Sequence, residues 1–314
     1  MEITSVQNPK IKELLALQEK SRLRREKGLF VVEGQRELQH CMNAGYQVDT
    51  IFWCPEICGG TFGAWLSMHT VNTTQPTKDA LVSPHAKSSA SQTPPQAVPP
   101  LTWPRVSMDC HEVTHASSSE ARVKVFEVSR EVYAKVAYRE GTEGVIAEVR
   151  AQSHSLNDLK LSDAPLLIVL ESVEKPGNLG AVLRSADAAG ADAVIICDPL
   201  TDIYNPNLIR ASIGGVFTTQ LATCESEEAI DWLKAQGIKI LTAQLQDSEW
   251  YYDTDMKCGT AIVIGTEATG LTDVWRDAAD AHIKIPMLGR LDSLNASVSA
   301  AILLFEAVRQ RNSR

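Results

Sequence analysis

The sequence has no long apolar run. None of its stretches approaches the roughly 18 consecutive apolar residues that indicate a membrane-spanning helix. The N-terminus opens with polar and charged residues and has no sustained apolar core, which predicts that no signal peptide is present. Together these two absences predict a cytoplasmic protein.

An excess of positive charge is also missing. The net charge of −9 argues against a protein that coats nucleic acid through bulk positive charge. A local patch remains compatible with that average, because basic side chains gather near the start at Lys10, Lys12, Lys20, Arg22, Arg24, Arg25 and Lys27. They could contact phosphates. Glutamates alternate with them, so a solvated helix face is the competing interpretation.

Regularly paired cysteines are absent as well. The seven cysteines are odd in number and scattered, which favours reduced thiols over a disulfide framework. Five possible ligands, Cys54, Cys58, Cys110, His111 and His115, have spacing too loose for a structural zinc site. No metal is therefore expected.

Short apolar runs alternate with helical patterns in the second half of the chain. Strands are predicted at 166–170, 193–197, 238–242, 260–264 and 282–286. Helices are predicted between and after them, at 181–189, 207–213, 226–236 and 297–311. Such alternation is typical of an α/β domain with a mainly parallel sheet.

The length of 314 residues allows two domains. We place a first domain at 1–150, a linker at 151–164 and a second domain at 165–314. Within the first domain, residues from about 58 to 119 are polar and irregular, and they hold seven of the fourteen prolines. Such composition buries too little apolar surface to offset its ordering entropy, which predicts a mobile insertion.

The predicted strands of the second domain end in polar or glycine-rich turns. The first leads into Lys175-Pro176-Gly177-Asn178-Leu179-Gly180 and on to Arg184. Another breaks into Gly265-Thr266-Glu267-Ala268-Thr269-Gly270, whose glycines can adopt turn conformations and let a ligand approach the backbone. Because open α/β sheets bind ligands at the carboxyl ends of their strands, both turns are candidate sites.

The last predicted strand continues through Ile285-Pro286-Met287 to Ser293-Leu294-Asn295 and a long helix. Either Ser293 or Asn295 could cap that helix, because short polar side chains accept hydrogen bonds from the first free amides. The helix has an apolar face, Val298, Ile302, Phe305 and Val308, which core packing explains more readily than a partner does.

These three segments, in this order, resemble the signature motifs of the SpoU/TrmH branch of the SPOUT RNA methyltransferases. Residues between the motifs extend the resemblance, namely 186–196, 202–206 and 210–215. In the first half, 8–12, 29–38, 126–129 and 142–147 resemble the L30e-like substrate-binding domain that precedes many of these enzymes. The resemblance implies a C-terminal trefoil knot, S-adenosylmethionine as cofactor and a homodimer with its sites at the interface.

The implied reaction is methyl transfer to a ribose 2′-hydroxyl in structured RNA, with rRNA favoured over tRNA. Arg184 would bind a neighbouring phosphate or stabilise the developing alkoxide, because a guanidinium stays protonated and is a poor base. Asn178 and Asn295 would orient the ribose or Arg184, with Ser293 in support, and Glu267 would serve either catalysis or its own loop. The implied cofactor contacts are Gly265, Ile285, Met287 and Leu294, and the candidate RNA contacts are Arg22, Arg24, Arg25 and Arg36.

Two alternatives remain. A non-catalytic RNA-binding or ribosome-assembly protein could keep this fold, although the retained motif residues weigh against it. A conventional nucleotide-dependent enzyme such as a dehydrogenase would need G-x-G-x-x-G after an early strand. No such motif follows those strands, and Glu267 stands where the middle glycine of the 265–270 loop would be.

Overall fold

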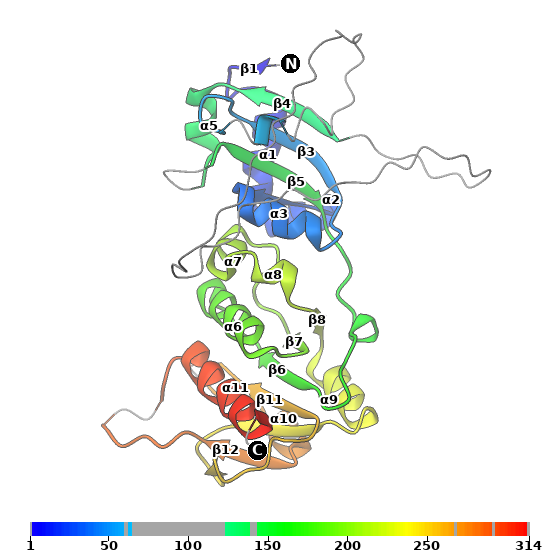
Figure 1. Ribbon diagram of the computed structural model, residues 1–314, viewed down its shortest axis with the longest axis vertical. Helices are drawn as coiled ribbons and strands as arrows, with labels where there is room; N and C mark the ends of the chain where they lie inside the picture. The colour runs from blue at the N-terminus through cyan, green and yellow to red at the C-terminus, as the bar shows by residue number, and fades with distance from the viewer. Residues whose placement is uncertain are drawn as a thin grey trace, which may run out of the picture.

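The computed structural model describes residues 2–59, 62–64, 123–138, 143–266, 269–290 and 293–312 (Figure 1). Most of the insertion that we predict between about 58 and 119 lies outside these residues. Glu267 and the candidate ligands Cys110, His111 and His115 lie outside them too.

The first part of the chain forms a five-stranded sheet of order β1-β4-β3-β5-β2. Its strands are β1 Glu2–Ile3, β2 Leu29–Glu33, β3 Val48–Trp53, β4 Lys124–Val128 and β5 Val145–Arg150. Its helices are α1 Pro9–Glu19, α2 Ser21–Lys27, α3 Gln35–Asn43 and α5 Arg130–Val136. Asn8 caps α1 by accepting a hydrogen bond from the Lys10 amide, and Pro9 occupies the first turn, where no amide donor is needed.

The second part forms a seven-stranded sheet of order β10-β12-β9-β11-β6-β7-β8, in which every strand pair is parallel. Its strands are β6 Leu166–Glu171, β7 Ala193–Cys197, β8 Leu221–Cys224, β9 Lys239–Ala243, β10 Glu249–Trp250, β11 Thr260–Ile264 and β12 Ala281–Lys284. Its helices are α6 Pro176–Ala189, α7 Pro206–Ser212, α8 Gly215–Thr218, α9 Ser226–Ala235, α10 Asp273–Ala278 and α11 Ala296–Asn312. Between the two sheets, a 3-10 turn covers Leu156–Asp158.

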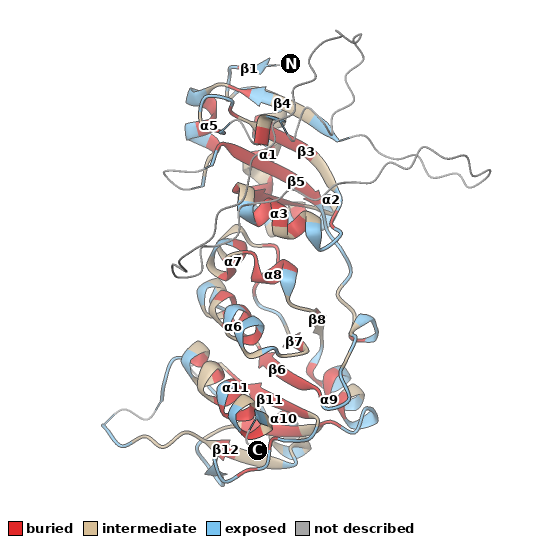
Figure 2. Ribbon diagram, in the orientation of Figure 1, coloured by how far each residue is buried: buried red, intermediate tan, exposed pale blue. Residues whose placement is uncertain are grey.

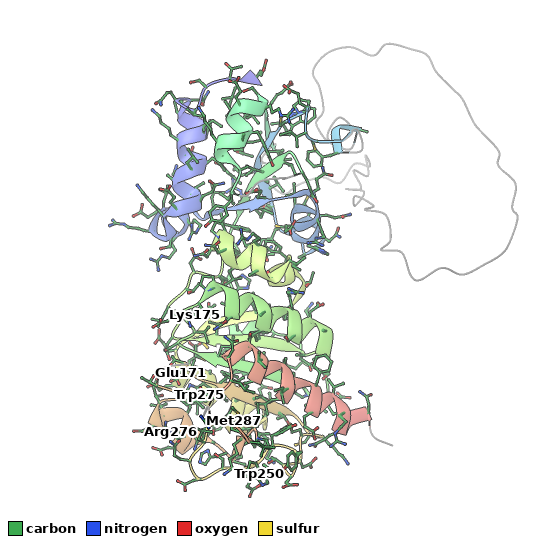
Figure 3. The ribbon with its side chains drawn as sticks, turned by 90° about the vertical axis from the view of Figure 1, so that its left-hand side faces the viewer. Glu171, Lys175, Trp250, Trp275, Arg276 and Met287 are labelled. Atoms are coloured by element: carbon green, nitrogen blue, oxygen red, sulfur yellow. The ribbon has the colours of Figure 1, made fainter. Side chains whose placement is uncertain are left out.

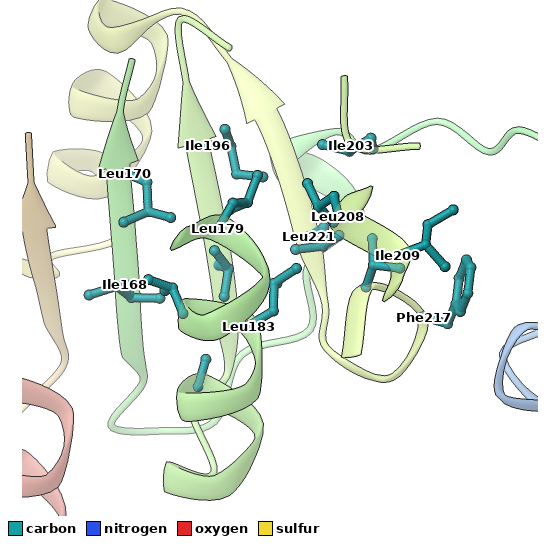
Figure 4. Packing of buried hydrophobic residues seen from close by; sticks show 14 of the residues in the cluster. Ile168, Leu170, Leu179, Leu183, Ile196, Ile203, Leu208, Ile209, Phe217 and Leu221 are labelled. Atoms are coloured by element: carbon teal, nitrogen blue, oxygen red, sulfur yellow. The ribbon is translucent and has the colours of Figure 1, made fainter. Parts of the chain in front are cut away.

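Helices cover both faces of the seven-stranded sheet, so its central strands are buried throughout (Figure 2). Alternate residues of a strand point to opposite faces. Ile168 and Leu170 of β6 pack with Leu179 and Leu183 of α6 (Figure 4), whereas Val169 packs in the opposite layer with residues of α9 and α10. The continuous apolar runs in the sequence are those of a parallel sheet covered on both faces.

The two sheets meet through aromatic and ionic contacts. Phe30 of β2 stacks on Tyr204, with ring centroids 4.1 Å apart and planes 15° from parallel. Beside them, buried Arg24 contacts Asp202 at 2.6 Å and donates hydrogen bonds to the Leu17 and Gln18 carbonyls. The expectation that Arg24 binds RNA is therefore wrong, because its guanidinium is buried and committed to this junction.

Gly180 lets α6 approach α7 closely. A Cβ atom at this position would lie 2.6 Å from the Ala211 Cβ and 2.8 Å from the Ser212 nitrogen. At Gly177, on the same helix, a Cβ would meet nothing within 4 Å. The two glycines therefore form a matched pair for testing the packing of α6.

We expect Gly180→Ala to lower the free energy of unfolding by about 1 to 3 kcal/mol, since overpacking forces neighbouring backbone to move. Gly177→Ala should leave it unchanged or raise it by up to about 1 kcal/mol, because alanine favours helix. Urea unfolding followed by circular dichroism measures both. Equal effects of the two substitutions would contradict the role assigned to Gly180.

Candidate functional site

A pocket of about 350 Å³ opens where β9, β11 and β12 end. Small-molecule sites typically measure about 300 to 1,000 Å³. The lining comes from the last residues of those three strands, the turns after them, α10 and the first half of α11: Ala243, Gln244, Leu245, Gln246, Ile264, Gly265, Thr266, Thr269, Gly270, Leu271, Arg276, Ile283, Lys284, Ile285, Met287, Ser293, Leu294, Ala296, Ser299 and Leu303. This is the edge of the sheet at which open α/β folds bind ligands.

All four residues that the resemblance implies as cofactor contacts line this pocket. Gly265 comes from the turn after β11, Ile285 and Met287 from the segment after β12, and Leu294 from just before α11. Ser293, which we expected to support catalysis, lines it as well. The structure thus brings together residues that lie up to 29 positions apart in the sequence.

The turn after β11 closes on itself. Thr266 and Gly270 exchange two backbone hydrogen bonds of 3.2 and 3.1 Å, and Gly270 adopts a φ of +70°, which favours glycine. A Cβ at Gly265 would lie 2.4 Å from the Gly270 carbonyl carbon. Gly265 is therefore required by the close approach of the loop to itself, in addition to any ligand.

Glu171 fixes the end of the same loop. Its carboxylate, buried at the end of β6, accepts hydrogen bonds from the Thr272 amide at 2.9 Å and from the Thr272 hydroxyl at 2.6 Å. Figure 3 shows Glu171 together with Arg276 and Met287 in the C-terminal part of the molecule. A buried carboxylate with two donors is a firm anchor, so Glu171 holds Leu271 and the turn before it against the sheet.

Asn295 joins the first and third motifs. Its side-chain oxygen accepts a hydrogen bond of 3.0 Å from the Ser297 amide, as a helix cap does for α11. Its side-chain nitrogen donates to the Asn178 side-chain oxygen at 3.2 Å. Of the two predicted caps, Asn295 is the one observed, and its hydrogen bond holds Asn178 of α6 near the N-terminus of α11.

Arg184 does not line the pocket. It lies on α6, and its side chain is exposed. Within the described part of the chain it forms no ion pair. The structure therefore leaves Arg184 at the surface, outside the group of residues that line the pocket.

The other three arginines proposed for RNA contact are accessible. Arg22 and Arg25 are exposed on α2, and Arg22 forms an ion pair of 2.7 Å with Glu26. Arg36 is half-exposed on α3 and lies 3.5 Å from Glu37. The Arg22 pair is exposed and therefore weak, and the Arg36 contact is long and leaves half of its side chain exposed, so both arginines remain able to contact phosphates.

The sequence did not predict the pocket-lining residues that follow β9 or the one in α10. Gln244, Leu245 and Gln246 follow a strand that was predicted, so the strand-end rule could have found them. Arg276 lies on the six-residue helix α10, and its sequence carries no signal of a pocket. No cluster of three or more metal-ligating side chains occurs among the described residues, and no described helix is long and apolar enough to cross a membrane.

A parallel α/β sheet with a pocket at the carboxyl ends of its strands defines a small-molecule-binding domain. Comparisons with known proteins identify the family to which this domain belongs. The sequence profile of the SpoU rRNA Methylase family matches residues 165–305, and that of the MRM3-like substrate binding domain matches residues 8–98. A 23S rRNA (guanosine-2′-O-)-methyltransferase RlmB from Ralstonia nicotianae is 34% identical over 62% of this chain and 81% of its own length. A 23S rRNA (uridine(2479)-2′-O)-methyltransferase from Streptomyces viridochromogenes is 35% identical over 54% of this chain, and the match spans 61% of that relative's length.

Solved structures match along the whole chain. An RNA 2′-O ribose methyltransferase is 32% identical with a TM-score of 0.72, over 99% of both chains. An AdoMet-bound rRNA methyltransferase from Sinorhizobium meliloti is 25% identical with a TM-score of 0.77, over 100% of this chain and 99% of that one. The chain therefore belongs to the SpoU rRNA methylase family, and the expected SPOUT fold class is confirmed. It is a methyltransferase of the S-adenosylmethionine-dependent class.

Proposed function

We propose that this protein methylates a ribose 2′-hydroxyl of ribosomal RNA. The observation that carries the proposal is the pocket after β9, β11 and β12, which the four predicted cofactor contacts all line. The relatives named above act on 23S rRNA, which supports rRNA as the substrate class. The domain limits 1–150 and 165–314, with the first domain holding the RNA, remain part of this proposal.

The pocket fits S-adenosylmethionine in size and chemistry. Backbone groups at Gly265, Ile285, Met287 and Leu294 would offer hydrogen bonds, and Ile264, Ile283 and Leu303 would offer apolar surface. The cofactor supplies a methyl group that is already activated by a positive sulfur. The protein then has to align the ribose oxygen with that methyl and assist loss of the hydroxyl proton.

The linked amides of Asn178 and Asn295 would orient the ribose, because they hold each other and Asn295 lies between the lining residues Leu294 and Ala296. Ser293 would support this pair from the pocket wall. Arg184 would bind the neighbouring phosphate or stabilise the alkoxide as the proton leaves, and Glu267 would accept a hydrogen bond from Arg184 or fix its own loop. Arg22, Arg25 and Arg36 would hold more distant phosphates.

A homodimer is part of the same proposal. Arg184 lies outside the pocket of its own subunit, on α6, which packs beside α11. Helix α11 in turn exposes Val298 and Phe305. A second copy that covers this face would bring an Arg184 towards a pocket. We also propose a cytoplasmic location, which the free thiols of the described cysteines support.

The test is methyl transfer by the purified full chain, with labelled S-adenosylmethionine and separate pools of rRNA and tRNA. We expect label in rRNA. The methylated ribose should resist alkaline cleavage at its 3′ phosphate, because that cleavage needs a free 2′-hydroxyl. Label in tRNA alone would show that the reaction is as proposed but that its substrate is tRNA. If cofactor and RNA both bind but no methyl is transferred to mature or unassembled rRNA, the protein is a non-catalytic member of its family.

A further inference from the structure

The described lining of the cofactor pocket carries two charged side chains, Arg276 and Lys284, and both are cationic. S-adenosylmethionine has one anionic group, the α-carboxylate at the end of its methionine part. A carboxylate held in a partly enclosed pocket needs a cation or several donors to offset its lost hydration. One of these two side chains is therefore the natural partner for that group.

Lys284 already has a different contact. Its ammonium nitrogen lies 5.0 Å from the centre of the Trp250 ring, within cation–π distance. Residues 284 and 250 are register partners on the adjacent strands β12 and β10, so the contact follows from the sheet itself. Lys284 is thus held at the outer edge of the sheet by Trp250.

Arg276 presents an unused pair of donors. Its Nη1 contacts the Asp273 carboxylate at 3.3 Å, and the Asp273 side chain is 87% exposed. Its Nε is buried and has no hydrogen-bond partner in the described part of the chain. Nε and Nη2 form the edge of the guanidinium that binds a carboxylate through two parallel hydrogen bonds. A buried donor without a partner is costly, which favours a ligand that fills this position.

The neighbouring backbone places that edge beside the glycine turn. Arg276 lies one helical turn after Thr272, whose amide and hydroxyl donate hydrogen bonds to Glu171. Its Nη2 lies 4.0 Å from the position that a Cβ of Gly270 would occupy. The guanidinium therefore lies next to the turn, and the turn itself lines the pocket.

We propose that Arg276 binds the α-carboxylate of S-adenosylmethionine through Nε and Nη2, and so selects a cofactor with an intact amino-acid end. This inference rests on the proposed function, because it assumes that the pocket holds that cofactor. Arg276 is a binding residue in it and takes no part in the transfer of the methyl group.

Calorimetric titration of the full chain with S-adenosylmethionine and with its decarboxylated analogue tests the proposal. The two probes share the sulfonium, the amine and the adenosine and differ in the carboxylate alone. We expect Arg276→Gln to weaken S-adenosylmethionine about 10- to 100-fold, the range for losing hydrogen bonds to a charged group, and to leave the analogue within about twofold. The affinity of Arg276→Lys for S-adenosylmethionine should lie between those of the unaltered chain and Arg276→Gln, because lysine keeps the charge and loses the paired donors of the guanidinium.

Lys284→Gln is the matched control, because it removes the same charge from the same pocket. It should change both affinities equally and slightly. Equal weakening of both probes by Arg276→Gln would overturn the proposal and assign Arg276 to the shape of the loop. Unchanged affinities with a raised KM for RNA would overturn it in favour of a phosphate contact. If the unaltered chain binds neither probe, the proposed function fails with it.

Discussion

Replacing Arg184 with alanine is expected to lower kcat for RNA methylation about a hundred- to a thousandfold while leaving the affinity for S-adenosylmethionine unchanged. The loss follows from removing a charged donor that acts on developing negative charge, an interaction of the size measured for such donors elsewhere. The unchanged cofactor affinity follows from the position of Arg184, which is on the exposed side of α6 and outside the pocket lining.

Single-turnover rates with labelled cofactor and calorimetric binding measure the two quantities separately. Asp187→Asn is a suitable control, since it changes an exposed charge on the same helix. A loss of cofactor affinity that accounts for the loss of rate would contradict the role of Arg184 in the transfer step. An unchanged rate would remove Arg184 from the site altogether.

Much of the second sheet could be predicted because its strands are apolar throughout and end in glycine or polar turns. The 260–264 run was predicted at the bounds that the structure shows for β11, and the loops after β11 and β12 do line the pocket. β8 and β10 were missed. They have four and two residues and too little pattern to stand out from the neighbouring loops.

The part of the site that the sequence could not supply depends on contacts between distant segments. Arg24 and Arg25 are adjacent in one basic run, yet the first is buried against Asp202 and the second is exposed. Likewise, Glu171 ends a strand that was predicted correctly, but its bond to Thr272 crosses 101 positions. Nothing in a single chain's residue pattern distinguishes such a partner from an ordinary surface side chain.

Helix α11 is the clearest case in which packing differed from expectation. Its apolar face was attributed mainly to the core, and Val308 does pack against the core. Val298 and Phe305, however, are 46% and 47% exposed. The core explanation is therefore wrong for these two. Two large apolar side chains exposed on one face of a long helix are compatible with the proposed dimer contact.

We expect Val298→Glu combined with Phe305→Glu to convert the proposed dimer into a monomer and to reduce methylation as much as Arg184→Ala does. Carboxylates placed in an apolar contact between two copies would have to be buried without partners, which costs more than a small interface returns. Because both positions are exposed in the single chain, the free energy of unfolding of the monomer should change little. Light scattering after gel filtration gives the mass, and the labelled-cofactor assay gives the rate.

Leu288→Glu is the control, because Leu288 is 97% exposed and lies off this helix. An unaltered chain that is already monomeric and active would rule out the dimer, and an active monomeric variant would show that each subunit holds a complete site.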